Sequence, residues 1–159
     1  MKQTILTFYK FTPFPDFEVW KKKLLREGNR LSILGSIILA KEGINATISG
    51  LDSDVREFFH WIKSNELFSD LRARESVSPR KTFYRLKIFL RKEIVSLGDD
   101  SINPNELVGQ YVEPEEWNEI INNPEMTIID TRNDYEIALG TFEGAVNPKT
   151  KTFRQWRAF

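Results

Sequence analysis

Three residues with chemical potential lie close together in the last third of the sequence. Asp130 and Arg132 directly follow the short apolar run 126–129, and Glu136 comes four residues later. A carboxylate and a guanidinium at the end of a buried strand can place charges at the entrance to an active-site loop. The same pair can also form an ion pair that only fixes the loop, because such networks are common outside active sites. Both interpretations remain open from these residues alone.

The residue types that most often act as nucleophiles or metal ligands are almost missing. The sequence has no Cys and a single His, His60. Without thiolates or a second imidazole, neither a cysteine nucleophile nor a zinc site can form from these residues. We therefore expect no catalytic nucleophile and no metal site in this chain, and we expect His60 to lie on a helix surface. No cofactor can be assigned.

A basic stretch, residues 72–92, holds eight Lys or Arg and one acid. Within it, residues 83–91 alternate as a strand, with Tyr84, Leu86, Ile88 and Leu90 on one face. The other face carries Arg85, Lys87, Phe89 and Arg91. Cationic groups bind phosphates and an exposed aromatic ring stacks on an unpaired base, so this face is predicted to bind RNA together with Tyr9 and Thr7. The alternatives are a solvated face or a surface that docks the acidic residues 93–131.

A turn within residues 40–50 offers further candidates. Lys41 and Asn45 flank Gly43, which a tight turn needs for its backbone conformation. Asn45 can hydrogen-bond to its own turn, which is a structural role. The functional alternative is that Lys41 and Asn45 contact RNA or a neighbouring domain.

These residues must be positioned by two folded parts. Residues 4–9, 36–40, 45–49 and 83–91 are expected to be strands, and helices are expected from Asp16 to about Arg26, ended by Gly28, and over 52–63. The order β-α-β-β-α-β predicts an α+β ferredoxin-like domain over residues 1–98, with both helices on one face of the sheet and Trp20 in the core.

An acidic stretch with Asn, Pro and Gly, 99–110, is predicted to be a linker. After it, Pro114 and an apolar stripe with Trp117 predict a helix whose stripe is buried, and 126–129 predicts a buried parallel strand. Residues 111–159 would then be the opening part of an α/β domain.

Composition and charge limit the class of protein. Hydrophobic residues make up 40% and charged residues 29%, and no apolar run approaches the ~20 residues of a membrane helix. The N-terminus lacks the pattern of a signal peptide, so a cytoplasmic protein without a membrane partner is expected. The net charge of zero hides +8 in residues 1–92 and −10 in residues 93–131. Such asymmetry suggests two units with different partners.

Two motifs carry a resemblance to a known family. Asp130-Thr131-Arg132, Tyr135-Glu136 and the stretch 140–147 (GTFEGAVN) resemble the first signature of rhodanese-like domains. The stretch 40–50 (AKEGINATISG), with 91–95 (RKEIV), resembles one rhodanese-containing family, the bacterial tRNA uridine hydroxylases (TrhO).

The resemblance implies an oxidoreductase that forms 5-hydroxyuridine at the tRNA wobble position, with molecular oxygen as co-substrate. Its partner would be the tRNA anticodon loop and not DNA. Asp130, Arg132 and Glu136 would support the rhodanese site rather than take part in its reaction.

The sequence departs from the family in two places. Thr141 stands where rhodanese-like domains usually have His, and the family's C-T-G-G-I-R-C loop, which supplies the cysteine, is absent. We therefore expect the rhodanese-like part to be incomplete and the chain alone to be inactive. The alternatives are a fragment of a rhodanese-type sulfurtransferase and a non-catalytic module that binds RNA or docks on a protein.

Overall fold

A computed structural model describes residues 2–95, 97–98, 106 and 109–158. The chain forms two compact units, Met1–Val95 and Ser96–Phe159. The predicted linker, residues 99–110, lies almost wholly outside the described residues.

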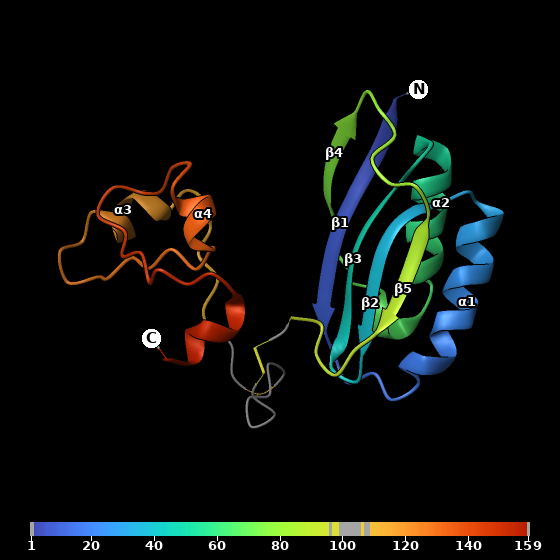
Figure 1. Ribbon diagram of the computed structural model, residues 1–159, viewed down its shortest axis with the longest axis horizontal. Coiled ribbons are helices and arrows are strands. Elements are labelled where there is room, and N and C mark those ends of the chain that lie inside the picture. Colours follow the sequence, from blue (N-terminus) through green and yellow to red (C-terminus); the bar gives the residue numbers. More distant parts are fainter. Residues whose placement is uncertain (1, 96, 99–105, 107–108, 159) are drawn as a thin grey trace. The chain divides into compact units, whose positions relative to one another are not determined.

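The first unit is one five-stranded sheet with two helices packed on one of its faces (Figure 1). The strand order is β4-β1-β3-β2-β5, and the fold is the α+β ferredoxin-like class that the sequence predicts. In chain order its elements are β1 (Gln3–Phe11), α1 (Phe17–Arg30), β2 (Leu34–Ala40), β3 (Gly43–Gly50), α2 (Asp52–Lys63), the 3₁₀ turn η1 (Glu66–Phe68), β4 (Arg74–Ser78) and β5 (Leu86–Leu90).

The sheet has one strand more than the sequence predicts. The unpredicted strand, β4, pairs antiparallel with β1 at one edge. The strand predicted over 83–91 is β5, begins at Leu86, and pairs parallel with β2 at the opposite edge. Because no residue of β4 is buried, its sequence has no alternating apolar pattern, and only backbone pairing with β1 makes it a strand. Tyr84, expected to share the apolar face, lies outside the strand and is 95% exposed.

The core lies between the sheet and the two helices. Alternate residues of β1, β2 and β3 enter it, as do Val55, Phe58 and Ile62 from one side of α2. Trp20 is buried as predicted, and its ring contacts those of Phe14, Trp61 and Phe68.

Helix α1 continues past the point where the sequence predicts its end. Gly28 was expected to stop the helix, but it is buried inside α1 and faces β5. A Cβ at this position would collide with the Leu86 side chain, so Gly28 allows the helix and the strand to approach closely. The helix ends instead before Ser32, which adopts a left-handed φ of 52°.

The second unit has little regular structure among its described residues. It contains α3 (Trp117–Ile121), α4 (Asp134–Ile137), the 3₁₀ turn η2 (Phe153–Ala158) and a parallel bridge between Ile129 and Val146. The buried strand predicted for 126–129 is wrong, because Ile129 is 40% exposed and pairs only through this bridge. Trp117 was expected in a core, but it is 40% exposed and stacks on Phe142 with ring centroids 5.8 Å apart.

Candidate functional site

The face of the sheet opposite the helices, which we call the open face, carries most of the residues predicted to bind RNA. The strand register places Lys87 and Phe89 of β5 on this face, because their neighbours Leu86, Ile88 and Leu90 pack against the core. No Asp or Glu occupies an open-face position on any of the five strands. On the five strands, the open face therefore carries two cations, Arg74 and Lys87, and no carboxylate.

The predicted basic and aromatic residues differ in their surroundings. Arg85 and Lys87 are exposed. The guanidinium of Arg91 lies 5.0 Å from the centre of the Phe89 ring, which is half-buried. Tyr9 is 53% exposed, and its ring meets that of Phe11 edge-on. Cationic groups of this kind can bind phosphate, and aromatic rings can stack on unpaired bases.

The turn between β2 and β3 has a structural contact that the sequence does not reveal. The Asn45 side chain donates to the Ile94 carbonyl oxygen at 3.1 Å, and the Glu42 carboxylate accepts from the Ile94 backbone N–H at 2.6 Å. Together they hold the segment after β5 against the turn, over a separation of about 50 residues that no local pattern could predict. Lys41 remains exposed at the tip of the turn.

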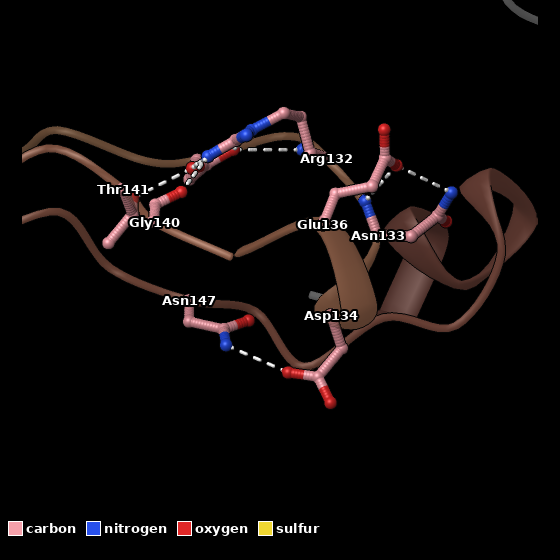
Figure 2. A network of polar contacts seen from close by, with 8 residues as sticks. Arg132, Asn133, Asp134, Glu136, Gly140, Thr141 and Asn147 are labelled. Atoms are coloured by element: carbon pink, nitrogen blue, oxygen red, sulfur yellow. Dashed lines mark hydrogen bonds and ion pairs between the residues drawn. The ribbon is translucent and has the colours of Figure 1, made fainter. Parts of the chain in front are cut away.

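The second unit places Asp130 and Arg132 in one polar cluster. Figure 2 labels Arg132, Gly140 and Thr141 of this cluster. The Asp130 side chain is only 7% exposed. It accepts hydrogen bonds from Arg132 Nε at 3.0 Å, Arg132 Nη2 at 2.6 Å and the Arg132 backbone N–H at 3.1 Å. The Thr141 hydroxyl donates a further bond at 2.7 Å, and Arg132 Nη2 also donates to the Gly140 carbonyl oxygen at 2.6 Å.

These bonds determine what Asp130 can do. The hydrogen bonds from Arg132 and then Thr141 hold the pKa of Asp130 well below its ordinary range. An ionised carboxylate whose oxygens already accept several bonds is a poor proton acceptor in catalysis. Its arrangement instead ties the end of the 126–130 segment to the turn at 140–141, as a positioning pair would.

Glu136 has a structural role that is separate from the Asp130–Arg132 pair. Its carboxylate accepts from the Asn133 backbone N–H at 3.1 Å and from the Asn133 side chain at 3.0 Å, at the start of α4. This is a helix-capping contact, whose N-x-x-E pattern is visible in the sequence. Beside it, Asn147 Nδ2 donates to Asp134 at 2.8 Å. Thr141 and Asn147 belong to the 140–147 motif, but the sequence did not predict their bonds to Asp130 and Asp134.

The described residues contain no group of three or more His, Cys, Asp or Glu placed to hold a metal ion. Within the same residues, no helix is both long and apolar enough to span a membrane.

The lowered pKa of Asp130 predicts how the stability of the second unit depends on pH. Its contribution to stability is present above the ordinary carboxyl pKa of 3.8 and is lost as the pH falls through the lower folded value. We expect amide exchange in segment 139–142, corrected for its intrinsic rate, to show unchanged protection from about pH 7 to about pH 4. Asp130→Asn should lower this protection at neutral pH, and its difference from the wild type should shrink below about pH 4. A wild-type loss of protection between about pH 6 and pH 5 would contradict the assignment.

Comparison with known proteins identifies the fold of the first unit. Residues 3–94 match the UPF0176 acylphosphatase-like domain. Among solved structures, the BLUF protein BlrB in its dark state is 21% identical with a TM-score of 0.50, over 68% of this chain and 86% of that one. Acylphosphatase from Bacillus subtilis is 14% identical with a TM-score of 0.41, over 57% of this chain and 100% of that one.

A longer relative extends the match to almost the whole chain. The tRNA uridine(34) hydroxylase of Picosynechococcus sp. is 43% identical over 152 residues, which is 96% of this chain and 51% of the relative. The chain thus spans about half the length of that relative. The chain belongs to the UPF0176 family, and its first unit is the acylphosphatase-like domain of that family.

Proposed function

We propose that this chain is one half of an enzyme that hydroxylates uridine 34, the wobble uridine, of tRNA to 5-hydroxyuridine with molecular oxygen. The observation that supports the proposal best is the 43% identity to a tRNA uridine(34) hydroxylase over 96% of the chain. In this proposal the enzyme acts in the cytoplasm, on the anticodon loop of its tRNA substrate.

The two units would have different roles in this enzyme. The first unit would bind the tRNA on its open face, through Arg85, Lys87, Arg91 and the rings of Tyr9 and Phe89. The basic character of that face and the absence of acids from its strands support this role. Lys41 and Asn45, at the turn, would lie at the border of the RNA surface, with Asn45 holding Ile94 in place.

Residues 111–159, within the second unit, would form part of a rhodanese-like domain. Asp130 and Arg132 would be positioning residues that set the 140–141 turn, and Glu136 would fix the start of α4. The reacting cysteine of such a domain is not among these 159 residues. Arg132, whose side chain is 46% exposed, and Thr141, which is also exposed, are the members of the cluster that a substrate could reach.

The function is tested in a bacterial strain from which the gene for the whole protein has been deleted. Nucleoside mass spectrometry of its tRNA should show loss of 5-hydroxyuridine, and the whole protein should restore it. The 159-residue chain alone should restore none, because thiolate chemistry needs a cysteine. An unchanged level of 5-hydroxyuridine in the deletion strain, or loss of a thiolated nucleoside instead, would overturn the proposal.

A further inference from the structure

One row of open-face side chains crosses the whole sheet, and we call it the central row. The pairing register aligns Thr7 with Arg74 on one side and with Thr47 on the other. Thr47 is then aligned with Ser36, and Ser36 with Lys87. The central row therefore reads Arg74, Thr7, Thr47, Ser36 and Lys87 from β4 to β5. It has a cation at each end and three hydroxyl groups between them.

The rest of the open face is partly covered at both ends of the strands. At one end, the loop between β4 and β5 crosses the sheet, and the Thr82 backbone N–H donates to the Gln3 side chain at 3.1 Å (Figure 1). Ser49, an open-face residue at that end, is fully buried. At the other end, Ile94 is buried against the turn between β2 and β3. The central row lies between these two covers, and Arg74, Thr7 and Lys87 in it are exposed.

The cations of the central row are available to a ligand. Elsewhere in the first unit, Lys10 pairs with Asp70, Arg30 with two glutamates and Arg56 with Asp52 and Glu75. Within the described part of the chain, by contrast, neither Arg74 nor Lys87 makes an ion pair. Four inter-strand spacings separate them, which is about 19 Å. At roughly 3.4 Å per stacked nucleotide, this span corresponds to at most about six nucleotides, and to fewer in an extended strand.

The hydroxyl groups between the cations suit one class of ligand. The Thr7 and Thr47 hydroxyls lie 3.2 Å apart and share one hydrogen bond. Each hydroxyl is one donor and two acceptors, so both keep capacity for a partner. A ribose 2′-hydroxyl is both donor and acceptor, and it distinguishes RNA from DNA. The neighbouring row of open-face residues carries Tyr9 at one end and Phe89 at the other.

We propose that the central row is the path of a single strand of RNA, which crosses the sheet perpendicular to its strands. Arg74 and Lys87 bind phosphates at the two ends, and Thr7, Thr47 and Ser36 bind ribose hydroxyls between them. Bases stack on Tyr9 and Phe89 alongside. This rests on the proposed function for the kind of partner, and it adds Arg74, the three hydroxyl residues and the direction of the strand.

The test measures binding of a fluorescein-labelled uridine-rich RNA octamer, and of its DNA counterpart, by anisotropy at several salt concentrations. Arg74→Gln and Lys87→Gln should each reduce the log–log salt slope by about 0.7, and the double variant by about 1.4. Thr47→Val should bring RNA affinity several-fold closer to DNA affinity. Lys22→Gln, an exposed position on α1, removes the same charge from the helix side and should leave the slope unchanged.

The outcomes separate this inference from the proposed function. A double variant that keeps the slope of Lys22→Gln while it remains folded by circular dichroism would overturn the central row as the RNA path. Equal wild-type affinity for RNA and DNA would overturn the ribose contacts. Neither result bears on the formation of 5-hydroxyuridine in the deletion strain. A deletion strain with unchanged 5-hydroxyuridine would overturn the enzyme assignment but not a measured RNA path.

Discussion

Replacing Gly43 by Ala is expected to lower the free energy of unfolding of the first unit by about 3 kcal/mol. Gly43 begins β3 with a φ of 142°, a backbone conformation that residues with a Cβ rarely adopt. A Cβ there would also collide with the backbone carbonyl oxygen of Lys10 in β1. Because this clash is with the backbone of a paired strand, the pairing between β1 and β3 would have to separate locally. The measurement is urea unfolding followed by circular dichroism.

Gly50→Ala is the matched control for this prediction. It lies at the other end of the same strand, and its φ is not in the positive region. A Cβ there would meet the Val55 side chain at 3.1 Å and the Ile33 side chain at 3.6 Å, and it would lie 3.9 Å from the nearest backbone atom, the Ser32 carbonyl oxygen. Its expected cost is about 1 kcal/mol or less. Equal destabilisation by the two changes would show that the backbone of Gly43 is not the cause.

The second prediction concerns three basic residues in and beside β5. Changing Arg85, Lys87 and Arg91 together to Gln should flatten the salt dependence of anticodon stem-loop binding. Three phosphate contacts with a single strand contribute a log–log slope of about −2, at ~0.7 per contact, because each releases condensed counterions. All three side chains are exposed, so the first unit should stay folded. The measurement is titration at several salt concentrations, with circular dichroism as the control for folding.

Two results would count against this prediction. Binding with unchanged affinity and slope would show that this side of β5 does not contact the RNA. Loss of the folded signal would show that these side chains support the fold. The second result would be unexpected, because Leu86, Ile88 and Leu90, and not the basic residues, pack against the core.

Much of the first unit was predictable because its pattern is local. The alternation in β1, β2 and β3 and the helical spacing of Val55, Phe58 and Ile62 indicate which side of each element is buried. The same reasoning separated the basic side of residues 85–91 from the apolar side. Local pattern could not reveal β4, which buries none of its side chains, nor the parallel pairing of β5 with β2.

The candidate site shows the same division. Asp130 and Arg132 are only two residues apart, so the sequence by itself indicated that they could form an ion pair. The contact of Glu136 with Asn133 is also short-range, but the sequence analysis did not assign it. The partner hydroxyl of Thr141, eleven residues from Asp130, is determined by how the 140–141 turn folds back. A hydrogen bond of this kind depends on the conformation of a loop, and no periodic sequence pattern predicts a loop conformation.

The sequence by itself determined the family, the fold class of the first unit and the alternation that separates the basic from the apolar side of residues 85–91. Only the tertiary structure decided that Arg74 and Lys87 end one row across five strands, that the β2–β3 turn holds Ile94, and that Gly28 lies inside α1. The physical reason is the range of the interactions. Side-chain periodicity is set by the backbone geometry of one element, whereas strand order, register and buried polar contacts join residues that the chain brings together only when the sheet has formed.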